Sequence, residues 1–145
     1  MKKCSDVMTK SPVCCLPGDL VIKAARLMQS ENIGSIPVIE NEQTKNLVGI
    51  VTDRDLALKI LAEGRAATST TVEDVMTRDV VTCHINDDLQ KALDAMSERQ
   101  LRRIPVVDDD YQIVGIIAQA DVATRANQPE KTAEVVKEIS LSNTK

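Results

Sequence analysis

The chain has 145 residues, of which 43% are hydrophobic, and its 18 Lys and Arg against 22 Asp and Glu give a formal net charge of −4. That composition supplies an aliphatic core and excludes wholesale disorder. The absence of Trp and Phe leaves almost no rings for stacking bases, and the net charge is acidic, so we expect no nucleic-acid partner.

The start of the chain, Met-Lys-Lys-Cys-Ser-Asp, lacks the apolar stretch of a signal peptide. No apolar run approaches the roughly 18 residues that a membrane span needs. The four cysteines are therefore expected to be reduced thiols rather than a disulfide framework. We expect a cytoplasmic protein that makes no contact with a membrane.

The first half of the chain predicts an extended segment, a helix, two short strands and a second helix. Apolar residues recur at helical spacing behind Asp19, the expected N-cap. The strands are β-branched and are joined by a polar turn, and Gly64 is the expected C-cap of the second helix. In chain order the elements are residues 9–13, a helix behind Asp19, Ile36–Ile39, Leu47–Val51, and a helix from about Thr52 to Glu63.

A tandem repeat predicts the same elements a second time. Asp-Val-Met-Thr at 6–9 recurs at 74–77, an offset of 68, and aligning 5–39 with 73–107 gives 13 identities in 35 positions, where chance supplies roughly two. The offset falls to 66 between Val48-Gly49-Ile50 and its second copy. The second set comprises residues 82–85, a helix behind Asp87, Ile104–Val107, Ile113–Ile117, and a helix over about 119–127; a last amphipathic helix is expected over 130–139.

The predicted fold is α+β, with two tandem strand–helix–strand–strand–helix motifs packed as a pseudo-twofold pair and a short C-terminal helix. About 60 residues is small for an independent core, so the two copies are expected to pack on each other. The expected organisation is a first motif at 1–68, a second at 69–127 and a helical tail at 128–145.

The repeat resembles a pair of CBS motifs, the arrangement called a Bateman module. The resemblance rests on the Asp-Val-Met-Thr openings, the Ile-Pro-Val strands and the stretch Gly49-Ile50-Val51-Thr52-Asp53-Arg54-Asp55, and it covers about residues 5–126. More narrowly, the chain is similar to small stand-alone bacterial CBS-pair proteins of the hypoxic response protein type. The resemblance implies a regulatory module that binds an adenine nucleotide or adenosyl ligand between its copies and forms a homodimer.

The resemblance also implies which residues bind the ligand. Asp55 takes the ribose, Thr52 lies on the phosphate side, and basic residues before the second Ile-Pro-Val strand meet the phosphates of a ligand whose ribose the other copy holds. A carboxylate can accept two hydrogen bonds from a ribose diol, a helix start offers donors to a phosphate, and arginine binds phosphate bidentately. Gly49 is expected to let a ligand approach closely. The candidate residues are Thr52, Arg54, Asp55, Arg102, Arg103 and Asp121.

These residues also have plainer interpretations. Thr52 and Asp55 fit an ordinary helix cap, and the two arginines fit a solvated surface neutralised by Asp108–Asp110. The second signature has Ala118 in place of Ser or Thr and Ala120 in place of Arg. We therefore expect one competent nucleotide site, and a second that is weak, empty or adenosine-like in preference.

The cysteines suggest a second function. Cys15 and Cys83 are equivalent in the repeat, and His84 follows Cys83. If packing brings them together, these side chains would suit a Zn²⁺-type ion or an activated nucleophile, whereas cysteine in an aliphatic strand is usually a small core residue. The alternative to a nucleotide sensor is thus a metal- or redox-responsive interaction module with a vestigial nucleotide cleft.

The preferred interpretation is a stand-alone CBS pair that senses AMP, ADP, ATP or S-adenosylmethionine and signals energy or stress state to a protein effector that the sequence does not name. It needs no catalytic cofactor, because the chain has no Ser-His-Asp set, no His-Glu-x-x-His and no phosphate-binding Gly-x-x-x-x-Gly-Lys loop. We therefore expect no catalysis.

Overall fold

The computed structural model describes residues 2–125. The helix expected over 130–139 and the tail at 128–145 lie outside these residues. Within the described part, no helix is long and apolar enough to cross a membrane.

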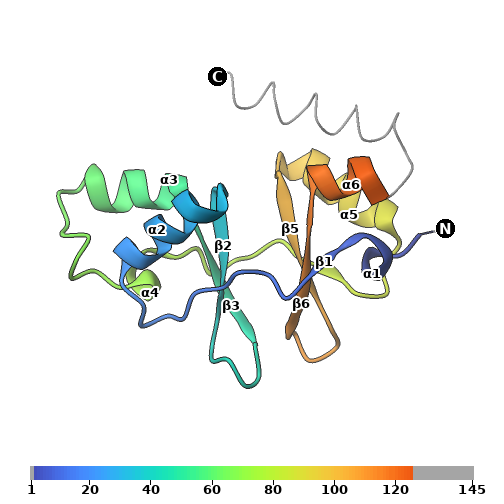
Figure 1. Ribbon diagram of the computed structural model, residues 1–145, viewed down its shortest axis with the longest axis horizontal. Coiled ribbons are helices and arrows are strands. Elements are labelled where there is room, and N and C mark those ends of the chain that lie inside the picture. The colour runs from blue at the N-terminus through green and yellow to red at the C-terminus, as the bar shows by residue number, and fades with distance from the viewer. Residues whose placement is uncertain (1, 126–145) are drawn as a thin grey trace. The chain divides into compact units, whose positions relative to one another are not determined.

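The described chain forms two compact units, one of which is assembled from two separate stretches. The continuous unit is Val13–Val80, and the split unit joins Met1–Pro12 to the chain from Val81 onward. Each unit carries a small sheet with helices packed on it (Figure 1). The units differ from the division at residue 68 that the repeat suggests, because the opening segment of each copy belongs to the unit of the other copy.

The split unit has a four-stranded sheet in the order β1-β6-β5-β4. Strands β5 and β6 form an antiparallel hairpin, β1 is antiparallel to β6, and β4 is parallel to β5. The elements of this unit are α1 (Cys4–Val7), β1 (Thr9–Lys10), β4 (Cys83–His84), α5 (Leu89–Arg99), β5 (Arg103–Val107), β6 (Ile113–Ala118) and α6 (Gln119–Arg125).

The continuous unit is built on the antiparallel hairpin of β2 and β3. Its α3 runs on into the π-helical turn η1, so the predicted helix is present, and the left-handed φ of 68° at Gly64 follows its end. The elements are α2 (Val21–Glu31), β2 (Ser35–Ile39), β3 (Leu47–Thr52), α3 (Asp53–Leu56), η1 (Ala57–Leu61) and α4 (Val72–Val75).

The exchange of opening segments follows the same rule in both units. Thr9, from the first copy's opening, pairs with Ile116 on β6 of the second copy. Its repeat equivalent Thr77 forms an isolated antiparallel bridge with Ile50 on β3 of the first copy. Two backbone hydrogen bonds, from the Ile50 N–H to the Thr77 carbonyl at 2.9 Å and from the Thr77 N–H to the Ile50 carbonyl at 2.8 Å, hold this segment against β3. Each hairpin is therefore completed by the opening segment of the other copy.

The signature glycines accommodate these exchanged segments. A Cβ on Gly49 would lie 2.7 Å from the Met76 sulfur and 3.0 Å from the Thr77 carbonyl oxygen. A Cβ on Gly115 would lie 2.5 Å from the Met8 sulfur and 2.9 Å from the Thr9 carbonyl oxygen. The expectation that Gly49 makes room for a ligand is therefore corrected, because the chain's own methionine occupies that space.

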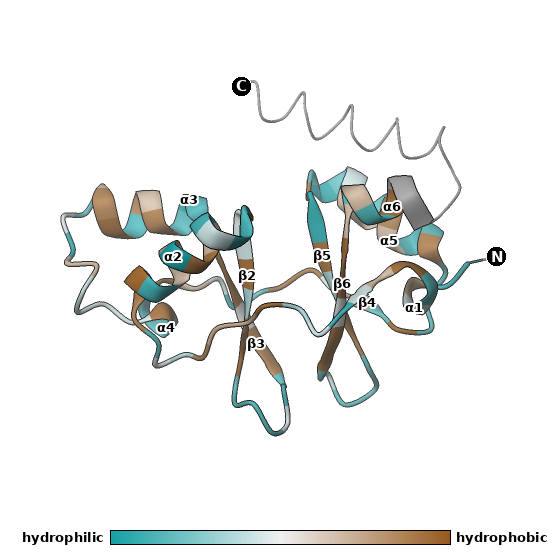
Figure 2. Ribbon diagram, in the orientation of Figure 1, coloured by the Kyte–Doolittle hydropathy of each residue, from teal (hydrophilic) through white to brown (hydrophobic). Residues whose placement is uncertain are grey.

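Two aliphatic cores result, one in each unit. Apolar residues colour most of β3 and β6, while the turns of the hairpins are hydrophilic (Figure 2). The repeat-related methionines, at positions 8, 28, 76 and 96, are all buried. Methionine is flexible and fills irregular gaps in a core, and buried cysteine packs as a small hydrophobic residue.

The helix starts differ by one residue from the prediction. The N-caps of α2 and α5 are Leu20 and Asp88, not Asp19 and Asp87. The two aspartates instead close the preceding turns, accepting bonds of 2.9 Å each from the backbone N–H groups of Leu16 and His84. Helices α1 and α4 were not predicted, because four residues show no apolar period.

Candidate functional site

The turn from β3 into α3 positions the first pair of predicted site residues. Thr52 is the N-cap, and its hydroxyl accepts a 3.0 Å bond from the Asp55 backbone N–H. The Asp55 carboxylate accepts a 3.0 Å bond in return from the Thr52 N–H. This reciprocal pair is a capping box, the geometry that the plainer interpretation of these two residues expects.

Asp55 makes further contacts that the sequence analysis did not identify. The residue is 8% exposed, its carboxylate lies 3.0 Å from the Lys59 ammonium, and the Thr77 hydroxyl donates to it at 3.4 Å. Lys59 also donates a 2.8 Å bond to the Val75 carbonyl. Asp55 and Lys59 thus connect the signature to the exchanged segment, and their i,i+4 spacing was the available signal.

The equivalent turn in the split unit runs from β6 into α6. Asp121 lies in the first turn of α6 and accepts a 3.2 Å bond from the Ala118 N–H. The Thr9 hydroxyl donates to the same carboxylate at 3.1 Å. Thr9, from the first copy's opening, therefore contacts Asp121 as Thr77 contacts Asp55.

Arg103 lies beside this turn, at the start of β5. It pairs with Ala118 across the hairpin. Burial lowers the pKa of Arg103, and the nearby carboxylate of Asp121 opposes this shift only in part. The guanidinium stays charged, because arginine is not deprotonated in proteins. Its Nη1 atom is buried and has no hydrogen-bond partner among the described residues.

The other two arginines of the prediction lie on the surface. Arg54 and Arg102 are exposed. The Arg54 N–H donates to the Asp53 carboxylate at 2.8 Å, and the Arg102 carbonyl accepts from the Gln119 N–H at 3.2 Å. At the position equivalent to Arg102 the continuous unit has Gly34, where a Cβ would lie 2.9 Å from an Asp53 carboxylate oxygen. The two copies thus differ in charge at this position, with an exposed arginine in one and a glycine in the other.

The predicted set of Cys15, Cys83 and His84 does not gather within one unit. Cys15 lies in the continuous unit, while Cys83 and His84 lie in the split unit. Over residues 2–125 no group of three or more His, Cys, Asp or Glu side chains is arranged to hold a metal ion. The candidate metal site therefore lacks a ligand set in the part of the chain that the structure describes.

The catalytic version of that set is corrected as well. His84 Nε2 lies 2.6 Å from an Asp109 carboxylate oxygen, and its Nδ1 accepts a 3.1 Å bond from the Asn86 N–H. Both ring nitrogens are thus engaged, and burial raises the pKa of Cys14 and of Cys15 to about 11. Neither thiol has the lowered pKa of an activated nucleophile.

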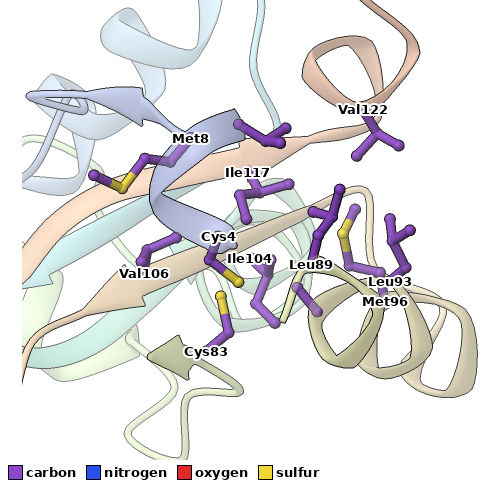
Figure 3. Packing of buried hydrophobic residues seen from close by; sticks show 12 residues of the cluster. Cys4, Met8, Cys83, Leu89, Leu93, Met96, Ile104, Val106, Ile117 and Val122 are labelled. Atoms are coloured by element: carbon purple, nitrogen blue, oxygen red, sulfur yellow. The ribbon is translucent and has the colours of Figure 1, made fainter. Parts of the chain in front are cut away.

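The thiol that does meet Cys83 is Cys4, which the sequence analysis left aside. Cys4 lies on α1 and Cys83 on β4, both in the buried cluster of the split unit. Their sulfur atoms point toward each other among apolar side chains (Figure 3). The repeat offered no signal for this pair, because the residue equivalent to Cys4 is Val72.

The protein is a tandem-repeat module with two copies of an α+β unit. In both copies the turn from strand to helix holds an aspartate that accepts a bond from the N–H three residues before it. The chain belongs to the CBS domain family, whose model matches residues 4–62 and 72–127. Among its relatives is the CBS domain-containing protein YhcV of Bacillus subtilis (strain 168), 36% identical over 143 residues and covering 99% of each chain.

Solved structures of CBS pairs are similar to this chain over most of its length. Hypoxic Response Protein I with two coordinated zinc ions is 30% identical, with a TM-score of 0.74 over 84% of this chain and 97% of that one. The CBS domain pair of MJ0100 in complex with 5-methylthioadenosine and S-adenosyl-L-methionine is 30% identical, with a TM-score of 0.71 over 85% of this chain and 94% of that one. CBSX2 in complex with AMP is 28% identical, with a TM-score of 0.74 over 90% of this chain and 99% of that one. The predicted family and α+β fold are confirmed.

Proposed function

We propose that this chain is a non-catalytic regulatory CBS pair that binds an adenine nucleotide or another adenosyl ligand. Two of the similar structures hold such ligands, AMP in one and S-adenosyl-L-methionine with 5-methylthioadenosine in the other. The ligand acts by linkage, since it shifts the protein only toward the state that it binds more tightly. The receiver of that shift is a protein effector, and the working form is a cytoplasmic homodimer.

The observation that carries the proposal is the buried Nη1 of Arg103, which has no hydrogen-bond partner within residues 2–125. A buried polar atom without a partner is rare in folded proteins and is often explained by a missing ion or ligand. A phosphate oxygen is the natural complement, because guanidinium–phosphate bonds are charge-assisted and directional. Asp121, next to Arg103, is an acceptor suited to ribose hydroxyls. These two groups match the two polar parts of a nucleoside phosphate.

The proposed site is thus centred on Arg103 and Asp121. It revises the expectation from the sequence, in which the arginines meet the phosphates of a ligand whose ribose Asp55 holds and the Asp121 turn is the weaker site. The other predicted residues keep defined roles. Asp55 with Thr52 is the second ribose-binding turn, available when a ligand's hydroxyls replace the contacts of Lys59 and Thr77. Arg54 and Arg102 are exposed, so they contribute to phosphate binding through long-range attraction rather than through buried bonds.

The test is calorimetric titration of AMP and of adenosine into the wild type and the variant Arg103→Ala. Loss of a hydrogen bond to a charged group costs about 1.5–3 kcal/mol, so AMP should bind roughly 10- to 100-fold more weakly to the variant. Adenosine has no phosphate, and its affinity should be unchanged. Arg99→Ala is the matched control, because Arg99 is an exposed arginine of the same unit and its loss changes the net charge equally.

Equal weakening by Arg99→Ala and Arg103→Ala would show that only net charge matters and would contradict the assignment of Arg103. No binding of any adenosyl compound to the wild type would contradict the proposed function as a whole. The runner-up function rests on the zinc-bound relative, so Zn²⁺ belongs in the same titration series. Stoichiometric zinc binding without nucleotide binding would favour the metal-responsive alternative.

A further inference from the structure

Cys4 and Cys83 form a thiol pair that the proposed nucleotide site does not use. They are 79 residues apart in the sequence, yet both lie in the buried core of the split unit. Cys4 is 0% exposed and Cys83 is 4% exposed. Figure 3 shows the two sulfur atoms facing each other, with Ile104 and Leu89 nearby.

The surroundings of the pair favour dithiol chemistry over metal binding. The neighbours are aliphatic, and over residues 2–125 no third His, Cys, Asp or Glu completes a ligand group around the sulfurs. Each sulfur also has a weak backbone acceptor, the Asp88 carbonyl at 3.9 Å from Cys4 and the Pro105 carbonyl at 3.8 Å from Cys83.

The continuous unit provides an internal comparison. Its positions equivalent to Cys4 and Cys83 are Val72 and Cys15, since 4 + 68 = 72 and 83 − 68 = 15. Val72 and Cys15 are both buried in the core of that unit. The same packing position is therefore filled well by valine, so core packing does not require a thiol at position 4.

We propose that Cys4 and Cys83 are a disulfide-forming site, which closes when the chain meets a small-molecule disulfide. One cysteine thiolate attacks the reagent's S–S bond, forms a mixed disulfide and releases one reagent thiolate. The second cysteine thiolate then attacks the protein sulfur of the mixed disulfide and releases the other reagent thiolate. Two protein thiols are oxidised by two electrons, one disulfide is reduced to two thiols, and the two protons pass to the released thiolates.

The roles of the two sulfurs follow from their surroundings. The Cys83 side chain lowers the pKa of Cys4, whereas the Cys4 side chain and burial raise the pKa of Cys83. Cys4 is therefore the attacking thiolate, and Cys83 closes the bond in the second step.

Access to the pair requires the opening of the N-terminal segment. Helix α1 is held by backbone bonds from the Cys4 N–H to the Asp87 carbonyl, 2.9 Å, and from the Ser5 N–H to the Ile85 carbonyl, 3.2 Å. A four-residue helix near a chain end opens more readily than the rest of a domain. Once formed, the bond would tie α1, and with it Thr9 on β1, to β4 of the same sheet, whose strand β6 leads into the α6 turn of Asp121.

The experiment treats the full reduced chain with 2-hydroxyethyl disulfide, blocks free thiols and maps the tryptic peptides by mass spectrometry. The expected product joins residues 4–10, which contain Cys4, to residues 79–91, which contain Cys83, with a loss of two free thiols per chain. The peptide over residues 11–23, which contains Cys14 and Cys15, should stay unlinked.

Cys4→Val is the matched variant, because it installs the residue that the continuous unit has at this position. It should keep its fold by circular dichroism and lose the cross-link; Cys83→Ala should also lose it, which covers a folding failure of the first variant. Cross-links through residues 11–23, or native protein that stays fully reduced under conditions that oxidise the urea-unfolded chain, would overturn the proposal.

Discussion

At the scale of single residues, Arg103 and Asp55 show two ways of placing charge in a small core. Arg103 has a buried donor atom without a partner among the described residues, and Asp55 is surrounded by donors. The contacts of Asp55 contribute to the stability of the folded protein whether or not a ligand binds. The contributions of the Asp55 contacts can therefore be measured in the free protein.

We expect Lys59→Met to lower the free energy of unfolding by about 1 kcal/mol, because it removes both an ion pair with a buried carboxylate and a bond to the Val75 carbonyl. Lys23→Met is the matched control. It removes an i,i+4 pair with Asp19 at 3.4 Å in which Lys23 is 59% exposed, and should cost about 0.3 kcal/mol. Urea unfolding measures both, and equal losses would contradict the role given to Lys59.

Cys15 gives a prediction for alkaline pH. Burial raises the pKa of its thiol from 9.0 to about 11, so the folded state holds this proton more tightly than the unfolded state. The resulting stabilisation is complete below about pH 9 and is lost as the pH rises through 11. Stability should therefore fall more steeply between these values in the wild type than in Cys15→Ala, as followed by urea midpoints. Parallel pH profiles would show that Cys15 ionises equally in both states.

At the scale of elements, the exchange of opening segments sets the architecture. Met8 with Thr9, and Met76 with Thr77, pack where Gly115 and Gly49 have no side chain. A methionine side chain can move aside, but the backbone carbonyl of Thr9 is held by its strand and cannot. The glycines are therefore required by the packing of the exchanged strands.

Gly115→Ala should destabilise the protein by about 1–3 kcal/mol, the usual cost of overpacking a core. Amide exchange of Thr9 and Lys10 should become faster, because the added methyl group displaces β1 from β6. In Gly18→Ala the new Cβ meets nothing within 4 Å, and a change within about 0.5 kcal/mol is expected. Unchanged exchange at β1 in Gly115→Ala would contradict this account of the glycine.

The hairpins and long helices could be predicted from sequence, because their apolar periods are local and occur twice. The exchange could not, because a repeat shows which segments are equivalent and not which copy each one joins. The capping box at Thr52 and Asp55 was foreseen as an alternative from its spacing. The contacts of Lys59, Thr77 and Cys4 could not be predicted from the sequence, since they depend on which copy each opening segment joins.

At the scale of the whole molecule, the proposed function makes stability depend on ligand. A ligand that binds only the folded state raises the free energy of unfolding by RT ln(1 + [L]/Kd). The pairing of a cationic donor with a carboxylate predicts a preference for compounds that carry both phosphate and ribose. The adenine preference that we propose rests on the ligands named for two similar structures.

The most direct measurement of this claim is the thermal unfolding of the reduced full chain with adenosine, AMP, ADP, ATP, S-adenosylmethionine, GTP or Zn²⁺. At about 100 times its Kd, a true ligand adds roughly 2.7 kcal/mol to the free energy of unfolding, an easily measured rise of the midpoint. We predict that at least one adenosyl compound raises the midpoint and that GTP does not. A midpoint that no adenosyl compound moves would contradict the account.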